Sequence, residues 1–260
     1  MSRNYIFCFS GSGNCLDIAK NIAAELGDTD IVMMRRRPAL TNVSGAERVG
    51  FVFPCHAGGL PGDVAEYVRN ISFSPDCYTF GVVSYAGYPG IGLAEIDKIR
   101  HLDYHSGISH QCSCIWLFPH SLMLPIMTGK KAQKRSEELA KKIGQAVLNK
   151  EKSPKSPSAP FFNKIESSVW PKLSAAKAEK LTVSGKCIGC GQCAGLCPKG
   201  NIRLSGGRPI FGNNCIQCLS CLQYCPTQAI NMGGVTVSRE RYRNPNVEAA
   251  ELNKSIIHID

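Results

Sequence analysis

The feature that most constrains this sequence is a cysteine pattern that occurs twice. Eight of the 14 cysteines lie within residues 187–225 of a 260-residue chain. The run C-x2-C-x2-C-x3-C-P begins at Cys187 and begins again 28 residues later at Cys215. Its thiols are Cys187, Cys190, Cys193 and Cys197 in the first copy, and Cys215, Cys218, Cys221 and Cys225 in the second. Because this segment is short, it has little apolar core, and metal ligation should supply much of its folding free energy.

Two kinds of metal site could use these cysteines. Three thiolates spaced by two residues surround one face of a cubane 4Fe-4S cluster, and a fourth thiolate comes from elsewhere in the chain. Zinc prefers two separated C-x2-C pairs around one tetrahedral ion and does not require the third and fourth cysteines at these spacings. The repeat therefore favours two 4Fe-4S clusters, with zinc as the alternative.

Composition limits the class of protein. Apolar residues form 43% of the chain, enough for a packed core. The longest apolar runs have five residues, whereas a membrane-spanning helix needs about 20. The N-terminal residues contain no apolar stretch of signal-peptide length. We therefore expect a cytoplasmic protein with no membrane span, in which patterned thiols bind metal or act in catalysis rather than form disulfides.

The positive charge is unevenly distributed. The net charge is +10, with 16 basic and 13 acidic residues giving +3 over 1–150, and 14 and 7 giving +7 over 151–260. No Asp or Glu occurs within 181–239. Such a surplus of positive charge is compatible with binding to nucleic acid or to an acidic protein. Bound clusters, at about two negative charges each, would offset part of the surplus, so we expect no nucleic acid.

The first 150 residues alternate between strand-like and helix-like patterns. Apolar runs predict strands at 5–9, 31–34, 49–53, 78–83 and 109–118, and apolar residues at helical spacing predict helices near 16–26, 64–71, 92–102 and 130–149. Short apolar strands that alternate with helices indicate a parallel sheet covered on both faces. The sequence therefore predicts an α/β fold, a doubly wound five-stranded parallel sheet of order 2-1-3-4-5.

The rest of the chain divides into three parts. Residues 151–180 are expected to form a proline-rich linker and a bridging helical segment, whose apolar stripe should pack on a neighbouring domain. The segment 181–235 holds the cysteine repeat and forms the second domain. The tail, 236–260, is mixed in composition and gives no functional signal of its own.

Three loops at the carboxyl ends of predicted strands are the candidate ligand site. They are Ser10, Gly11, Ser12, Gly13, Asn14 and Cys15; Pro54, Cys55, His56, Ala57, Gly58 and Gly59; and Ser84, Tyr85, Ala86, Gly87 and Tyr88. In the first loop, glycines and hydroxyls let backbone N–H groups surround a phosphate at a helix N-terminus. It lacks the Gly-Lys-Ser/Thr of a nucleotide P-loop, which favours a monophosphate bound without metal, as in FMN. For this loop alone, an ordinary strand-to-helix turn is an equal alternative.

The other two loops suit a flat ring, since they combine glycines with an aromatic or imidazole side chain. Ligands of open α/β sheets bind at this edge. We expect His56 to stack on the flavin, although a structural role or proton donation would also fit this residue.

The order of these motifs identifies a family resemblance. Residues 3–150 resemble flavodoxin, and nearly the whole chain resembles the flavodoxin–ferredoxin fusions of the EFR1 family of anaerobic bacteria and archaea. The similar segments are Cys187-Ile-Gly-Cys-Gly-Gln-Cys, Cys197-Pro-Lys-Gly-Asn-Ile, Cys215-Ile-Gln-Cys-Leu-Ser-Cys and Arg241-Tyr-Arg-Asn-Pro. The resemblance implies a flavodoxin-like domain with FMN, a small α+β bacterial-type ferredoxin domain with two 4Fe-4S clusters, and electron transfer.

The analogy with two-cluster ferredoxins also implies crossed ligands. One cluster would use Cys187, Cys190, Cys193 and Cys225, and the other Cys215, Cys218, Cys221 and Cys197. Three positions depart from the family pattern. Cys15 replaces a hydroxyl residue, His56 stands where Tyr or Trp is common, and the 118–121 loop differs, so no role is assigned to that loop.

Three functions are compared. We expect an electron carrier that joins FMN to the clusters, with an acidic ferredoxin or reductase as its redox partner. The flavin would face a cluster within one chain or across a homodimer. The alternative is an FMN-dependent reductase of a small substrate, with His56, Tyr85, Tyr88 or His120 as proton donor, but no acid–base pair has recognisable spacing. Nucleic-acid binding rests on charge alone and ranks last.

Overall fold

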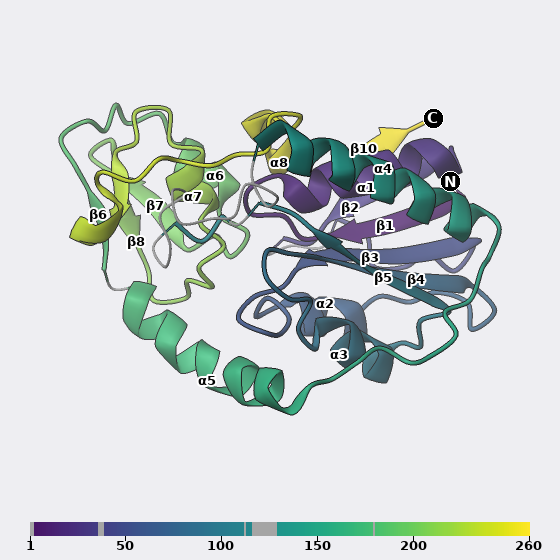
Figure 1. Ribbon diagram of the computed structural model, residues 1–260. Helices are drawn as coiled ribbons and strands as arrows, with labels where there is room; N and C mark the ends of the chain where they lie inside the picture. Colours follow the sequence, from purple (N-terminus) through teal and green to yellow (C-terminus); the bar gives the residue numbers. More distant parts are fainter. Residues whose placement is uncertain (1–2, 36–38, 112, 116–128, 179) are drawn as a thin grey trace.

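The computed structural model divides the molecule into two unequal parts (Figure 1). A helix-covered sheet, here called the sheet domain, forms the larger part, and residues 181–235, the cysteine domain, lie beside one end of it. The structure describes residues 3–35, 39–111, 113–115, 129–178 and 180–260.

The central sheet has six strands in the order β10-β2-β1-β3-β4-β5. Their bounds are β1 Asn4–Cys8, β2 Thr29–Met33, β3 Arg48–Pro54, β4 Tyr78–Tyr85, β5 Tyr104–Ser109 and β10 Ile256–Ile259. Strands β1 to β5 are parallel and follow the predicted order 2-1-3-4-5, so the doubly wound fold is confirmed. The loops that follow β1, β3 and β4 therefore meet at one edge of the sheet.

Two strands depart from the sequence prediction. The fifth strand was predicted over 109–118, but β5 ends at Ser109. It is an edge strand with mostly half-buried side chains, so it carries no apolar run to reveal it. Of the predicted segment, 110, 111 and 113–115 lie in a loop, and 112 and 116–118 lie outside the described residues. The sixth strand, β10, comes from the tail and pairs antiparallel with β2.

Helices cover both faces of the sheet (Figure 1). They are α1 Asn14–Leu26 and α4 Gly129–Leu148 on one face, and α2 Val64–Arg69 and α3 Gly92–Ile99 on the other. Apolar side chains of each helix meet those of the strands, as Leu16 and Ile22 meet Ile6 and as Val68 meets Phe51. Each such side chain is almost fully buried, and its burial contributes about 1.5–3 kcal/mol to folding.

The cysteine domain turns the sequence repeat into a structural repeat. Its elements are β6 Leu181–Val183, α6 Gln192–Leu196, β7 Ile202–Ser205, β8 Arg208–Phe211, α7 Ser220–Gln223, β9 Ile230–Met232 and the 3-10 turn η3 Gly234–Thr236. Strand β6 pairs with β9, and β7 pairs with β8. The short helices α6 and α7 contain Cys193 and Cys221, which are the equivalent third cysteines of the two runs.

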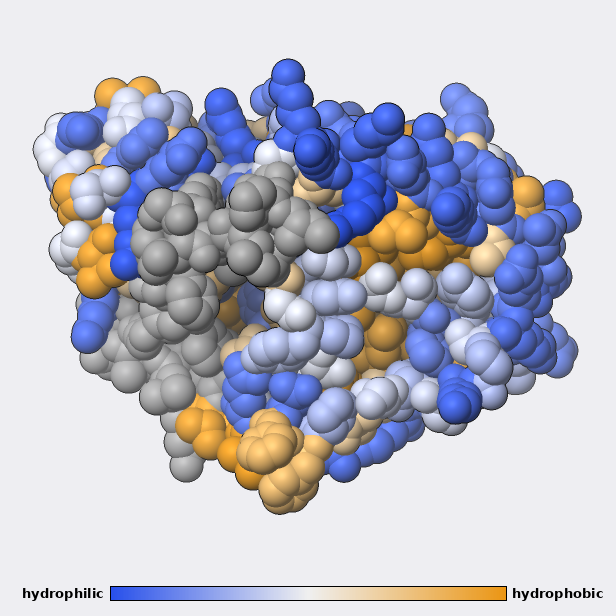
Figure 2. All heavy atoms as spheres, in the orientation of Figure 1, coloured by the Kyte–Doolittle hydropathy of each residue, from blue (hydrophilic) through white to orange (hydrophobic). Residues whose placement is uncertain are grey.

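A bridging helix, α5 Phe161–Ala178, joins the two parts along one side of the molecule (Figure 1). The helix continues through Pro171, since proline lacks one N–H donor but keeps a helical φ. Its apolar stripe was expected to pack on a domain, which is wrong for the described part. Phe162 is 83% exposed and Ile165 48% exposed, and Figure 2 shows hydrophobic surface where Figure 1 places this half of α5.

The polar side of α5 faces the sheet domain instead. The Glu166 carboxylate accepts hydrogen bonds from the Tyr88 hydroxyl at 2.5 and 2.6 Å. After the cysteine domain, the tail forms α8 Ala249–Asn253 and then β10. No helix among the described residues has the length and apolarity that crossing a membrane requires.

Candidate cofactor and metal sites

The eight repeated cysteines line two cavities, four thiols to each. Cys197, Cys215, Cys218 and Cys221 line the first, here called the proximal cysteine cavity. Cys187, Cys190, Cys193 and Cys225 line the second, the distal cysteine cavity. Each cavity thus takes three cysteines from one run and the fourth from the other. Within the described chain, no three His, Cys, Asp or Glu side chains converge on a point that would hold a single ion.

Backbone N–H groups are aimed at the fourth cysteine of each run. The N–H of Asn201 donates to Cys197 Sγ at 3.2 Å, and the N–H of Ala229 donates to Cys225 Sγ at 3.2 Å. Donors of this kind favour a thiolate, the form that binds metal. Burial acts to raise the pKa of Cys225, but the surrounding N–H groups outweigh it and the pKa is lowered. In both copies the donor follows its cysteine by four residues.

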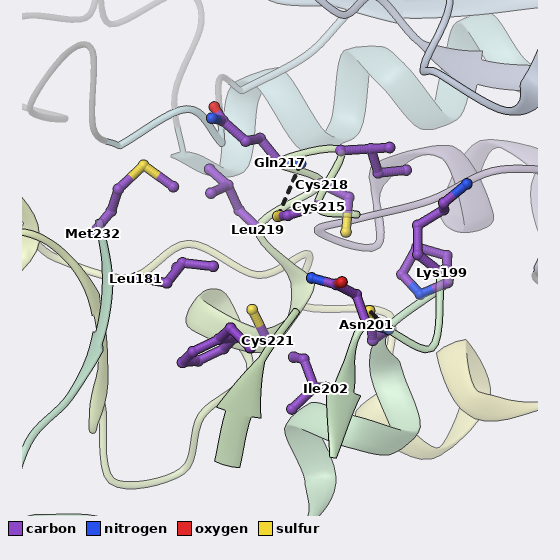
Figure 3. Close-up of a pocket in the computed structure, with 14 residues that line it drawn as sticks. Leu181, Lys199, Asn201, Ile202, Cys215, Gln217, Cys218, Leu219, Cys221 and Met232 are labelled. Atoms are coloured by element: carbon purple, nitrogen blue, oxygen red, sulfur yellow. Dashed lines mark hydrogen bonds between the residues drawn. The ribbon is translucent and has the colours of Figure 1, made fainter. Parts of the chain in front are cut away.

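The hairpin β7–β8 closes one side of both cysteine cavities. Alternate residues of a strand share a face, and here Ile202 and Phe211 line the proximal cavity while Leu204 and Pro209 line the distal one. Figure 3 shows Ile202 with Leu181 and Met232 around the labelled proximal cysteines. Apolar side chains therefore line much of both cysteine cavities.

A third cavity of about 240 Å³, here called the sheet-edge cavity, opens at the carboxyl ends of β1, β3 and β4. Its lining includes every residue predicted for the three loops except Gly13 and Gly59. Seven further lining residues were not predicted: Gln111, Ser113, Cys114, Glu166, Gln217, Cys218 and Leu219. They come from segments far away in the sequence, so no local pattern marks them.

The first loop of this cavity joins β1 to the N-terminus of α1. Gly13 precedes the helix with φ +96°, a conformation that favours glycine. The side chain of Asn14 is engaged by protein groups: its amide NH2 donates to the Gln111 carbonyl at 3.1 Å, and its oxygen accepts from the Tyr242 hydroxyl at 2.7 Å. Burial raises the pKa of Cys15, so its thiol stays protonated. Backbone N–H groups are thus the main donors that this loop offers.

The second and third loops supply ring systems. His56 meets Phe9 edge to face, with ring centroids 6.1 Å apart. Loss of hydration lowers the pKa of His56 to about 4, so this imidazole is neutral at physiological pH. Tyr85 and Tyr88 line the same cavity. Of the proton donors considered for the reductase alternative, His120 lies outside the described residues.

One short segment forms a wall common to two cavities. Gln217, Cys218 and Leu219 line both the sheet-edge cavity and the proximal cysteine cavity. The two domains are also joined here by direct contacts: Lys199 forms an ion pair with Asp63. A cysteine-domain loop therefore separates the two candidate cofactor sites of one chain.

Comparison with known families identifies the cysteine domain. Residues 186–230 match the family described as the 4Fe-4S dicluster domain. This part of the chain is a ferredoxin-type iron–sulfur domain, which favours 4Fe-4S clusters over the zinc alternative. A comparison with curated proteins returned no match.

Three solved structures resemble 56% of the chain at low identity. Rubredoxin oxygen:oxidoreductase from the anaerobe Desulfovibrio gigas has a TM-score of 0.36 and 14% identity. The flavodiiron protein from Giardia intestinalis has a TM-score of 0.34 and 10% identity. Our chain covers 36% of each of these two. Smu.1420 from Streptococcus mutans has a TM-score of 0.36 and 10% identity, and 99% of its chain is covered.

Proposed function

We propose that this protein is an electron-transfer flavo-iron-sulfur protein of an anaerobic cytoplasm. The proximal and distal cysteine cavities would each hold one 4Fe-4S cluster on their four thiolates, with the crossed ligands inferred from sequence. The sheet-edge cavity would hold FMN. When bound, FMN exchanges electrons singly or in pairs and each cluster exchanges them singly, so the chain would link carriers of the two kinds.

The chemistry of the lining supports these assignments. Four thiols and no other ionisable side chain except Lys199 line the proximal cavity, and only thiols are ionisable in the distal cavity. At the sheet edge, loop 10–15, here called the phosphate loop, precedes the 13-residue helix α1. Its free N–H groups and the positive end of the helix dipole favour a phosphate. Tyr85, Tyr88 and the neutral His56 suit a flat aromatic ring.

The common wall at Gln217, Cys218 and Leu219 is the observation that carries the proposal. It lies between the flavin site and the proximal cluster site of the same chain. Thus no homodimer is needed to bring the flavin beside a cluster. Cys218 is itself one of the four thiols of the proximal cavity, so a cluster ligand borders the flavin site directly.

The outer end of the cysteine domain supports an acidic protein partner. In the distal cavity, Cys190 is exposed, and its neighbour Ile188 is 66% exposed. Lys186, Arg203 and Arg208 are also exposed in this acid-free segment. An apolar contact area with surrounding cations would attract an acidic ferredoxin or reductase and hold it near the distal cluster.

Anaerobic purification with flavin binding tests the function. We expect about eight iron atoms, about eight sulfides and one FMN per chain. FMN should bind far more tightly than riboflavin, because the phosphate loop and the α1 dipole contribute only when phosphate is present. Equal affinity for FMN and riboflavin, or about one metal ion per four thiols, would contradict the proposal.

A further inference from the structure

Two carbonyl groups of the phosphate loop, those of Gly11 and Ser12, are bonded to groups outside the first 150 residues. The carbonyl of Gly11 accepts a hydrogen bond from the Ser220 hydroxyl at 2.8 Å. The carbonyl of Ser12 accepts from the Tyr224 hydroxyl at 3.1 Å and from the N–H of Asn244 at 2.8 Å. The cysteine domain and the tail thus complete this loop.

These bonds fix the direction of the loop N–H groups. In a trans peptide, the C=O of one residue and the N–H of the next point in opposite directions. With the Gly11 and Ser12 carbonyls held on the cysteine-domain side, the N–H groups of Ser12 and Gly13 face away from that domain. Ser12 lines the sheet-edge cavity. The contact that holds the Gly11 carbonyl outside therefore directs the Ser12 N–H toward a phosphate in this cavity.

Glycine lets the cysteine domain approach this closely. A Cβ on Gly11 would overlap the carbonyl oxygen of Cys218, and a Cβ on Gly13 would lie 2.7 Å from the Tyr224 hydroxyl. Both glycines thus serve the domain contact as well as the loop conformation. Tyr224 is 1% exposed, and its hydroxyl lies between the Ser12 carbonyl at 3.1 Å and the Val247 carbonyl of the tail at 3.3 Å.

Both side-chain donors are placed by the cysteine run. Ser220 follows Cys218 by two residues, and Tyr224 directly precedes Cys225. Because the domain has only a small apolar cluster, around Leu219 and Leu222, metal ligation must supply much of the energy that orders this segment. Without its clusters, the segment would not hold the two hydroxyls against the phosphate loop.

We propose that Ser220 and Tyr224 are positioning residues of the flavin site and that they couple FMN binding to cluster assembly. The inference rests on the proposed FMN site and extends it across the domain boundary. Clusters order the run, the run orders the phosphate loop, and the ordered loop binds phosphate. By thermodynamic linkage, FMN must stabilise the clusters by the same factor by which the clusters strengthen FMN binding.

A double variant, Ser220→Ala with Tyr224→Phe, tests the positioning role in the full chain. The Gly11 carbonyl then loses the Ser220 hydroxyl, and the Ser12 carbonyl keeps only the Asn244 N–H. The loop should become less ordered, and we expect the Kd for FMN to rise about tenfold. The Kd for riboflavin should stay within about twofold, since riboflavin lacks the group that the loop binds. Ser205→Ala, an exposed position on β7, is the matched control and should change neither value. A variant that loses affinity for both flavins equally, or for neither, would overturn the role.

Iron release from the wild-type protein tests the linkage without any variant. Saturating FMN should slow the transfer of iron to an iron(II) chelator under anaerobic conditions, and riboflavin should not. Identical release rates with and without FMN would refute the coupling. Failure of the FMN site itself has a different signature: iron-loaded wild-type protein would then bind FMN no better than riboflavin.

Discussion

The two copies of the cysteine run have similar backbone conformations but different surroundings. The residues two and four positions after the first cysteine have positive φ in both: Gly189 and Gly191 in the first copy, at 69° and 75°, and Gln217 and Leu219 in the second, at 55° and 61°. The first copy faces solvent, with Cys190 exposed. In the second, Gln217 and Leu219 are buried at 6% and 5% exposure against the sheet domain.

The second copy has side chains at two positions where the backbone conformation favours glycine. A residue other than glycine in the left-handed region costs about 1–2 kcal/mol. The second copy carries that cost at both positions, and both side chains line the wall between the sheet-edge and proximal cavities. Strain of this kind persists where the surrounding packing holds it in place. One copy is therefore exposed to solvent, and the other packs against the sheet domain and lines the sheet-edge cavity.

The largest expected effect is the loss of iron when thiols are removed two at a time. Cys197→Ala with Cys215→Ala removes two ligands of the proximal cavity only, so roughly half of the iron should remain. Cys193→Ala with Cys197→Ala removes one ligand from each cavity and should damage both centres. Iron analysis and low-temperature EPR of the reduced proteins measure this. The reverse result, with the second pair sparing one centre, would show ligands that are not crossed.

Substitutions at the positions with positive φ should have an intermediate effect, on stability. Gly189→Ala places a Cβ 2.8 Å from the Gly207 carbonyl at φ +69°, so we expect a loss of about 1–3 kcal/mol in stability. Gln217→Gly relieves backbone strain but adds freedom to the unfolded chain, and the net change should be within about 1 kcal/mol. The measure is resistance of the iron-loaded proteins to denaturant. Equal losses of stability in the two variants would show that the two copies do not differ in this respect.

Charge reversal at the solvent-facing end should have the smallest effect. Lys186→Glu with Arg203→Glu should lower the rate of reduction by an acidic one-electron donor several-fold, roughly tenfold at low salt. The wild-type rate should fall as ionic strength rises, because salt screens the attraction. Lys141→Glu with Lys142→Glu, two exposed positions in the second half of α4, is the matched control. A wild-type rate that is independent of salt would argue against a steered acidic partner.

Elements with a local signal were predictable from the sequence. The cysteine spacing indicated the domain that the family comparison identifies, and the buried strands β1 to β4 each carry an apolar run. Edge strand β5 was placed wrongly because Tyr104, His105 and Ser106 are half exposed, so burial did not select apolar residues there. The stronger apolar run that follows it attracted the prediction instead.

Contacts between distant segments left no local trace. Tyr242 and Asn244 reach Asn14 across 228 and 230 residues. Both segments carry recognisable motifs, but neither motif indicates that the two segments meet. The tail was therefore assigned no function, although it holds the phosphate loop. The wall at Gln217 and Leu219 was not predicted either, because these residues lie within a cysteine run that metal ligation already explained.

Strand β10 changes how the two domains are connected. It adds the end of the chain to the sheet that the start of the chain began, through pairs such as Ile257 with Ile31. The cysteine domain is thus an insertion enclosed by the sheet domain, not an appendage. One proteolytic cut in the linker at 151–160 would leave the fragments interlocked, because β10 on one fragment remains paired with β2 on the other. Releasing the cysteine domain from the sheet domain would require a second cut, between the cysteine domain and β10.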